Sequence, residues 1–199
     1  MVDLWLTSDW HLFHENLIKW QGRPFANAHE MNEMLITLHN ERVKPQDHVY
    51  NLGDVTMLRG SGAHRVEPLL QRLNGHQRLI LGNHDQCPVE WYRRFFEKIK
   101  AINVLDHIIF THIPIHECSI GRFTANVHGH THSNPSPMPS LQIDSATQQV
   151  RVIPYVNVCV EKTGYAPIHF DDVRQRIRLL AEGNCAPKDI ENAVRHKRT

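Results

Sequence analysis

The chain has 199 residues, with 22 Lys and Arg against 21 Asp and Glu and a formal net charge of +1. This balance gives no support to a strongly basic nucleic-acid-binding surface. The composition, 41% hydrophobic and 22% charged, is that of a globular protein and excludes a disordered one. No run reaches about 18 apolar residues, so we expect no membrane span. No signal peptide is apparent and no C-x-x-C pair occurs, so we expect a cytoplasmic location.

The length predicts one domain with a real core. We place that domain over residues 1–182 and a C-terminal extension over 183–199, for which a short helix is one interpretation. The extension ends in the basic run 195–198, which we interpret as a solvated end. A nucleic-acid contact there is the less favoured alternative.

In chain order, apolar and helical periodicities alternate along the sequence. Strands are predicted over 2–8, 48–52, 77–81, 99–104, 107–111, 125–128 and 155–160, with a hairpin over 141–144 and 149–153. Helices are predicted over 14–20, 27–42 and 88–97. A further helix, marked by Leu69, Leu70 and Leu73, is predicted to end near 74–75, and another to begin at 171. In the second helix, we expect Met31, Met34, Leu35 and Leu38 to form the apolar stripe, with Asn27 as its cap. This alternation predicts a layered α/β fold.

Side chains of the kinds that bind metal ions follow five of the apolar runs, at the points where the predicted strands end. In layered α/β folds, ligands collect beyond the carboxyl ends of strands, so we expect these side chains to meet. Two carboxylates, one amide and four imidazoles are too many for one tetrahedral zinc, and they suit two divalent ions sharing a bridging carboxylate. Asp54 is the central candidate for the bridge. The residues at these positions that the resemblance described next implies as metal ligands are Asp9, His11, Asp54, Asn83, His112, His130 and His132.

These blocks resemble the D-x-H, G-D, G-N-H-D, lone H and G-H-x-H blocks of the calcineurin-like metallophosphoesterase superfamily. The segment 7–16, with the later Arg-Pro-Phe at 23–25, is similar to the small bacterial and phage phosphoesterase branch. The resemblance spans residues 1–172 and implies a four-layered α/β/β/α sandwich with two facing sheets. It also implies Asp9, His11, Asp54 and His132 on one metal, and Asp54, Asn83, His112 and His130 on the other.

The resemblance further implies a catalytic role for His84, which would assist the leaving group, and for Asp85, which would orient His84 or a backbone group. The expected activity is hydrolysis of phosphodiester or phosphomonoester bonds by water that two divalent ions activate, with a phosphodiesterase favoured over a phosphatase. Mn²⁺ is the first expectation for the metal, with Zn²⁺, Fe²⁺, Ni²⁺ and Co²⁺ as alternatives. The segment 53–59 departs from the G-D-x-x-D-R-G pattern of protein phosphatases, so a small-molecule or nucleotide phosphoester is the expected substrate.

Two other functions use the same residues. A nuclease or nucleic-acid end-processing enzyme would need a basic, aromatic-lined groove or an added domain, which the charge balance does not favour. A non-catalytic scaffold on this fold would tend to lose ligands, and here all seven and His84 are present. The sequence makes no prediction of the oligomeric state.

Substrate contacts are harder to predict than metal ligands. His14, Arg23 and His116 are candidates, each set against a structural or surface alternative. We interpret His128 as packed rather than ligating. The loops at 59–62 and 135–139 and the region of Phe123 are the predicted walls of the substrate pocket.

Overall fold

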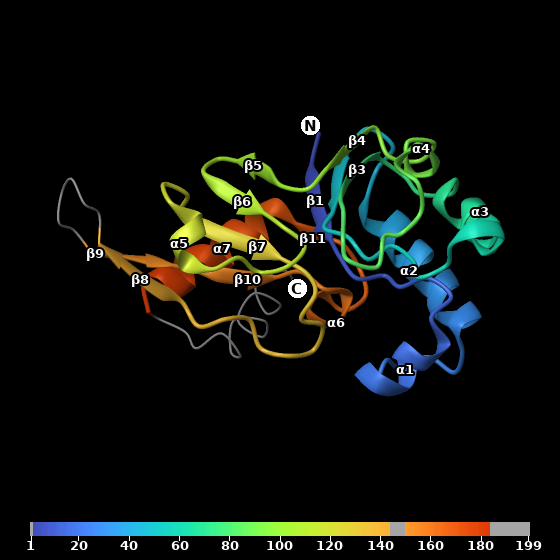
Figure 1. Ribbon diagram of the computed structural model, residues 1–199, viewed down its shortest axis with the longest axis horizontal. Helices are drawn as coiled ribbons and strands as arrows, with labels where there is room; N and C mark the ends of the chain where they lie inside the picture. Colours follow the sequence, from blue (N-terminus) through green and yellow to red (C-terminus); the bar gives the residue numbers. More distant parts are fainter. Residues whose placement is uncertain (1, 144–149, 184–199) are drawn as a thin grey trace.

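The computed structural model describes residues 2–143 and 150–183 and shows a mixed α/β protein with three β-sheets (Figure 1). The predicted layered α/β class is therefore confirmed at this level. The predicted helix and basic end of the C-terminal extension lie outside the described residues, except for Gly183. Among the described residues, no helix combines the length and the apolar character needed to cross a membrane.

The first sheet has five strands in the order β11-β1-β2-β3-β4, and its central strands are parallel. Its strands are β1 (Leu4–Thr7), β2 (His48–Asn51), β3 (His76–Ile80), β4 (Lys98–Lys100) and β11 (Ile168–His169). Strand β11 is short and runs antiparallel to β1 at the edge of the sheet. The parallel strands bring the residues that follow β1, β2 and β3 to one edge.

The second sheet has four strands in the order β10-β7-β6-β5. Its strands are β5 (Asn103–Leu105), β6 (Ile108–Phe110), β7 (Ala125–His128) and β10 (Tyr155–Asn157). Strands β6, β7 and β10 are parallel, so His112 and the segment 129–132 also follow carboxyl ends of strands. Strands β8 (Ser140–Ile143) and β9 (Val150–Ile153) pair antiparallel, as predicted, and extend away from the body.

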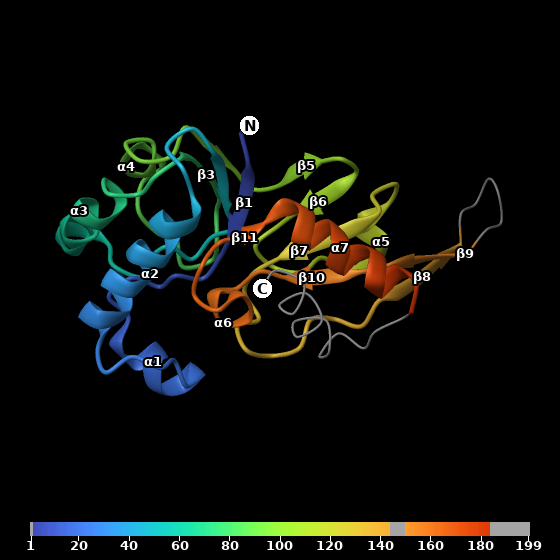
Figure 2. The same ribbon diagram turned by 180° about the vertical axis from the view of Figure 1, so that it is seen from behind.

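Helices cover both sheets. On the outer side of the first sheet lie α2 (Ala28–Arg42), α3 (Glu67–Leu70), α4 (Val89–Tyr92) and the 3₁₀ helix η1 (Gly60–Arg65). Helix α1 (Glu15–Gln21) projects from this end of the molecule. Seen from behind, α7 (Phe170–Ala181) contacts β1, β9, β10 and β11 (Figure 2). The short helices α5 (Glu117–Ile120) and α6 (Val160–Thr163) flank the second sheet.

Two main apolar clusters form the core. One joins the helices of the first sheet to it and includes Met31, Leu35 and Leu79. The other joins both sheets to α7, because apolar residues of β1, β2, β3, β6, β7 and α7 pack together in it. Val173 and Leu180 of α7 are buried there. The two sheets are thus held together by a shared core.

Helix α2 begins as predicted, because the side chain of Asn27 accepts a hydrogen bond from the backbone N–H of Glu30. Its predicted stripe is partly wrong. Met31 and Leu35 are buried, whereas Met34 is 40% exposed, and the buried face turns instead toward Asn32 and Ile36. The helix buries a polar Asn on its core face, which apolar periodicity alone does not detect.

Three predicted boundaries are wrong, each for a local reason. The segment 99–104 is not one strand, because the chain leaves the first sheet after β4 and enters the second at β5. Helix α4 ends at Tyr92 rather than near 97, since the backbone N–H of Glu97 already donates to the carbonyl of Gln77 in β3. Strand β10 ends at Asn157, whose side chain accepts from the N–H of Cys159 and turns the chain into α6.

Candidate metal centre

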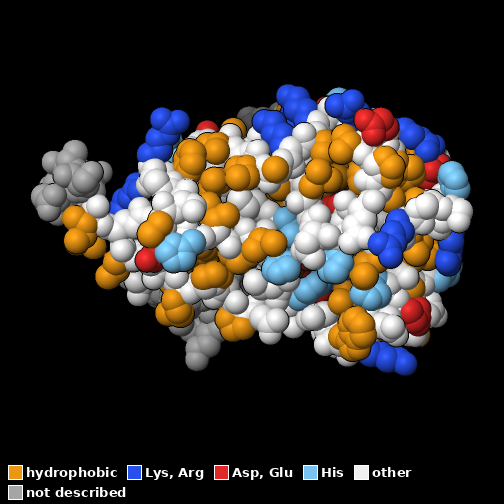
Figure 3. Space-filling view, viewed as in Figure 1, with side chains coloured by type: hydrophobic (Ala, Val, Ile, Leu, Met, Phe, Trp, Pro, Cys, Tyr) orange, Lys and Arg blue, Asp and Glu red, His pale blue; other side chains and the backbone are white. Residues whose placement is uncertain are grey.

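The carboxyl ends of the two sheets converge at one place, where the predicted ligands lie. A hydrogen bond fastens the two edges together: Nδ1 of His112, which follows β6, lies 2.7 Å from the carbonyl of Leu52, which follows β2. The backbone N–H of His130 donates to Oδ2 of Asp9 at 2.9 Å, joining the end of β7 to the end of β1. Histidine side chains gather in the middle of the face seen in Figure 3.

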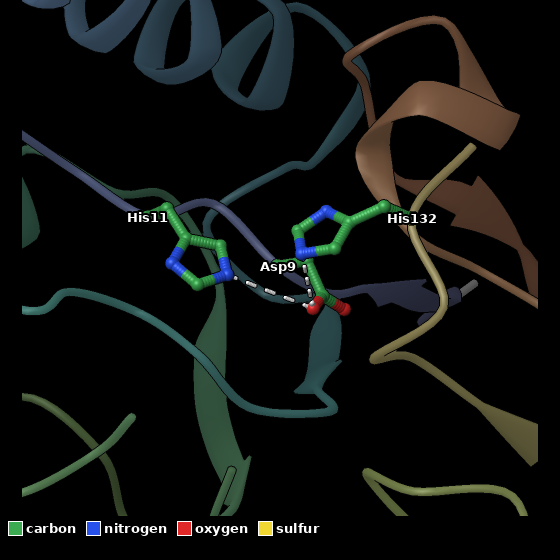
Figure 4. A group of neighbouring side chains, drawn as sticks. All are labelled: Asp9, His11 and His132. Carbon is green, nitrogen blue, oxygen red and sulfur yellow. Dashed lines mark ion pairs between the residues drawn. The ribbon is translucent and has the colours of Figure 1, made fainter. Parts of the chain in front are cut away.

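The first ligand group consists of Asp9, His11 and His132, whose ligand atoms lie within 4.8 Å of one another (Figure 4). Oδ1 of Asp9 lies 3.8 Å from Nε2 of His11 and 3.7 Å from Nε2 of His132. Both Asp9 and His11 are buried. These distances leave room between the three atoms for one cation, and the group could hold a metal ion.

The second ligand group consists of Asp54, His112 and His130, again with ligand atoms within 4.8 Å of one another. Oδ1 of Asn83 lies 2.9 Å from Nε2 of His112 and adds an amide oxygen to the group. Because Nδ1 of His112 faces the Leu52 carbonyl and is its natural donor, Nε2 keeps the free lone pair that a metal requires.

Asp54 lies between the two groups. Its Oδ2 is 3.3 Å from Nε2 of His11 and 3.3 Å from Nε2 of His112, so one oxygen faces a histidine of each group. Its other oxygen, Oδ1, accepts the backbone N–H of His84 at 2.9 Å. Asp54 therefore lies between the two groups and contacts a histidine of each.

Buried polar atoms without a hydrogen-bond partner indicate whether the two ligand groups could hold a metal. Oδ2 of Asp9 is fully engaged, because it accepts from Ser8, His130 and Cys159. By contrast, Oδ1 of Asp9 and both ring nitrogens of His11 are buried without a hydrogen-bond partner. Buried polar atoms are normally paired, and of these three, Oδ1 of Asp9 and Nε2 of His11 face one another across the site at 3.8 Å. The donor set of nitrogen and oxygen atoms thus fits divalent ions of the Mn²⁺ to Zn²⁺ range.

The backbone is strained at the ligands. Nine non-glycine residues in the described part of the chain have positive φ, and five of them are Asp9, His11, Asp54, His130 and His132. Each such residue costs of order 1–3 kcal/mol and persists only where the surrounding structure holds it. Strain of this kind concentrates at functional sites, and here it coincides with the ligand set.

Close packing of backbone explains the glycines beside the ligands. A Cβ on Gly82 would lie 2.2 Å from Oδ1 of Asp54, and one on Gly129 would lie 2.4 Å from Oδ2 of Asp9. Any side chain there would therefore displace a ligand.

Asp85 holds this packing in place. Its two carboxylate oxygens accept the backbone N–H groups of Gly82, Asp54 and Val55, and burial raises its pKa to about 6. Asp85 was expected to orient either His84 or a backbone group. In the structure it contacts backbone groups rather than the His84 side chain. We therefore regard Asp85 as a positioning residue.

A residue absent from the sequence predictions supports the first ligand group. Oε1 of Glu161, in α6, lies 3.0 Å from Nδ1 of His132 and also accepts from Nε and an Nη of Arg23 at 2.9 and 2.7 Å. A carboxylate behind a metal-ligating histidine fixes its ring and tautomer. Glu161 has no motif of its own in the sequence, because its partner lies 29 residues away.

For Arg23, the structure shows a structural pairing, the alternative that was set against a substrate contact. The Arg23 side chain is fully buried, and its guanidinium donates to Glu161 and to the backbone carbonyls of Asp9 and Trp10. A further contact to the sulfur of Met31 engages its remaining N–H group, so no donor remains for a phosphate. Arg23 instead fastens the loop after β1 to α6.

Replacing Glu161 with Gln should weaken metal binding about 10–100-fold, because His132 loses the carboxylate that orients it. The same change leaves the charge of Arg23 buried without its partner, which should lower the free energy of unfolding by about 3 kcal/mol. Metal titration followed by calorimetry, at a temperature where both proteins are folded, measures the affinity. The matched control is Glu33→Gln, which removes an exposed pair with Arg72 and should leave metal affinity unchanged. Equal affinities for Glu161→Gln and the wild type would contradict this role.

The metal-free fold should lose stability as pH rises. Burial alone would lower the pKa of His11, but the nearby carboxylates of Asp54 and Asp9 outweigh it and raise the pKa to about 9. Because this exceeds the unfolded value of about 6.5, the stabilisation is complete below pH 6.5 and is lost as pH rises through 9. The contribution of His11 to stability should be up to about 3 kcal/mol smaller at pH 9.5 than at pH 6 in the metal-free protein, and the difference between wild type and His11→Gln isolates it.

Thermal unfolding of metal-free protein across pH 6–9.5 measures this loss. The His11→Gln variant should show a smaller slope, since Gln does not titrate. Saturating metal should reduce the slope in the wild type, because an ion takes the place of the proton. A metal-free melting temperature that rises over this range would contradict the prediction.

The other predicted catalytic and contact residues divide by location. The ring of His84 is half-buried and its centroid is 5.4 Å from that of His11, so it borders the first ligand group. The ring of His14 is 5.6 Å from that of His11, and burial with the nearby His11 lowers its pKa to about 4. Both therefore lie at the site. His128 is buried against the carbonyl of Gly129, as expected for a packed residue.

His116 lies elsewhere. Its ring caps α5 by accepting from the N–H of Cys118, and it lines a separate hollow of about 480 Å³ with Met138 and Tyr155. The predicted pocket walls at 59–62, 135–139 and Phe123 do not line the cavity beside the ligands. That cavity, of about 340 Å³, is lined by Asn83 and His112 together with residues from 81–82, 101–102, 111, 113 and 115.

No family model matches the sequence. The chain is 32% identical over 185 residues to the uncharacterized protein MJ1445 of Methanocaldococcus jannaschii, covering 92% of this chain and 94% of that protein. It is 29% identical to the gene 66 protein of Mycobacterium phage D29, over 67% of this chain and 80% of that protein. The crystal structure of AQ665 from Aquifex aeolicus, a protein of unknown function, matches with a TM-score of 0.65. That match has 23% identity and covers 88% of this chain and 99% of the other, so it shows the fold alone.

Proposed function

Because the chain belongs to the family of the M. jannaschii protein MJ1445, whose name carries no activity, we propose its function from the site itself. The proposed function is a metal-dependent phosphoesterase of the calcineurin-like metallophosphoesterase superfamily, small bacterial and phage branch. It would act on small-molecule or nucleotide phosphoesters, with diesters favoured over monoesters. Two sheets with a shared core, covered by helices, support a four-layered α/β/β/α sandwich as its fold.

One observation carries the proposal: Oδ2 of Asp54 faces His11 and His112 at 3.3 Å each. A single carboxylate oxygen shared by two ligand groups supports two ions rather than one. Asp9, His11 and His132 would hold the first ion with Asp54, and Asn83, His112 and His130 would hold the second with Asp54. Mn²⁺ is the first candidate for both.

When bound, the two ions supply Lewis-acid chemistry, activating water for attack at phosphorus and offsetting the charge of the phosphoryl group. The chain's own residues then have three tasks. His84 donates a proton to the departing oxygen, since its half-buried ring borders the ligands and makes no hydrogen bond that would fix its proton elsewhere in the described part of the chain. Glu161 keeps His132 oriented, and Asp85 keeps the two loops of the second group in register.

Hydrolysis of bis-p-nitrophenyl phosphate and p-nitrophenyl phosphate by metal-stripped protein tests the proposal, with Mn²⁺, Ni²⁺, Zn²⁺ or Mg²⁺ restored in turn. We expect turnover only with metal, at a higher rate for the diester. A higher rate for the monoester would make the enzyme a phosphatase instead. No turnover with either ester while two ions are bound would overturn the activity proposed for these esters.

A further inference from the structure

A cavity of about 340 Å³ opens directly beside the second ligand group. Asn83 and His112 form the wall that faces the ligands. The rest of the wall is mostly aliphatic and includes Leu81, Ala101, Ile102, Ile113 and Ile115. A cavity that shares two side chains with the proposed metal centre is placed to receive whatever is attached to a phosphoryl group bound there.

Core packing explains part of the aliphatic wall, because Leu81 and Ile115 pack against core clusters, but it does not explain Ile102 and Ile113. Ile102 is 50% exposed and Ile113 is 48% exposed, and neither belongs to a core cluster. Ile102 lies where the chain crosses from the first sheet to the second, and Ile113 follows the ligand His112 by one residue. The hydroxyl of Thr111 donates to the carbonyl of Ile113 at 2.7 Å and so fixes the backbone that carries this side chain. Exposed aliphatic side chains held together around a cavity are typical of ligand recognition.

The charge of the cavity limits what it can accept. None of its lining residues is Lys, Arg, Asp or Glu. A second phosphate would therefore find no cation there, and burying its charge would be costly. The volume is at the lower end of the range for small-molecule sites, which suits one ring or a short chain.

We infer that this cavity binds an apolar ester substituent of the substrate, an aryl or short alkyl group, and so determines specificity. This inference depends on the proposed function, since it assumes that a phosphoryl group is held at the metal centre. It predicts a preference for apolar esters over polyphosphates, because those place charge where the aliphatic wall lies.

Binding of non-hydrolysable phosphonates to protein loaded with two Mn²⁺ per chain tests the inference without catalysis. Isothermal titration calorimetry would compare methyl-, n-butyl- and phenylphosphonate. Each methylene buried should tighten binding about fourfold, so we expect n-butyl- and phenylphosphonate to bind at least about tenfold more tightly than methylphosphonate. In Ile102→Ser this advantage should fall at least about threefold, while methylphosphonate binds as in the wild type.

The matched control is Ile143→Ser, which changes an isoleucine of 67% exposure on β8 and should keep the full advantage. Equal affinities for the three phosphonates would overturn the inference and leave the proposed function standing. Loss of the advantage in Ile143→Ser would also overturn it. Failure of all three, and of inorganic phosphate, to bind the metal-loaded protein would overturn the proposed function and the inference together.

Discussion

Asp54→Asn should lower kcat/KM for bis-p-nitrophenyl phosphate by about 10³-fold or more. The reason is that Oδ2 of Asp54 faces a histidine of each ligand group, at 3.3 Å from His11 and from His112. An amide has one neutral oxygen in place of the carboxylate charge that both ions would share. Binding of the second ion should therefore be lost first, and the activation of water should be lost with it. Steady-state kinetics, together with metal analysis after dialysis, measure both losses.

Asp106→Asn is the matched control, because Asp106 is also an aspartate with positive φ but pairs with Arg174 on the surface. It should keep wild-type kinetics and two ions per chain. If Asp54→Asn also retained two ions and wild-type turnover, Asp54 would not be the bridge.

His84→Ala should lower kcat about 10²–10⁴-fold while leaving two ions bound, because His84 borders the ligands without belonging to either group. The loss should depend on the ester. A substrate with an alkoxide leaving group needs a proton more than one with p-nitrophenolate, so its rate should fall further. Measuring wild type and variant with both kinds of substrate, one with an alkoxide leaving group and one with p-nitrophenolate, gives this dependence, which a purely structural defect would not produce.

His29→Ala, at an exposed position of α2, is the control and should change neither rate. An equal fall for both esters in His84→Ala, or a loss of metal, would contradict proton donation by His84.

Much of the fold could be predicted from sequence, because strands with apolar runs and helices with capped starts are local features. Asn27 caps α2 as its sequence suggested, and the strands ending before Asp9 and Asp54 are where periodicity placed them. The break between β4 and β5 could not be predicted, since it depends on which sheet each half of 98–105 joins. Pairing partners are a property of the whole chain.

The same distinction applies to the site. Candidate ligands such as Asp9, His11 and His112 could be predicted because each follows an apolar run. Glu161 could not, since its role arises only when α6 lies beside the segment that carries His132. For Arg23 the sequence left a phosphate contact and a structural pairing open, and its burial shows that it is a structural residue. Burial depends on tertiary packing, and a sequence motif does not reveal it.

Positive φ at the ligands also could not be predicted from sequence. Asp9, His11 and Asp54 take a conformation that favours glycine, and although Asp and His adopt it more often than most residues, the sequence does not show which of them do. Only the convergence of two sheet edges forces the chain to turn this sharply at each strand end.

A stepwise Mn²⁺ titration of metal-free protein, following bis-p-nitrophenyl phosphate hydrolysis at each equivalent, tests the central claim most directly. The ligand geometry predicts that turnover rises until two equivalents are bound and then stays constant, and that Asp54→Asn remains inactive throughout. Turnover that is already complete at one equivalent, or that proceeds without metal, would contradict a two-ion phosphoesterase.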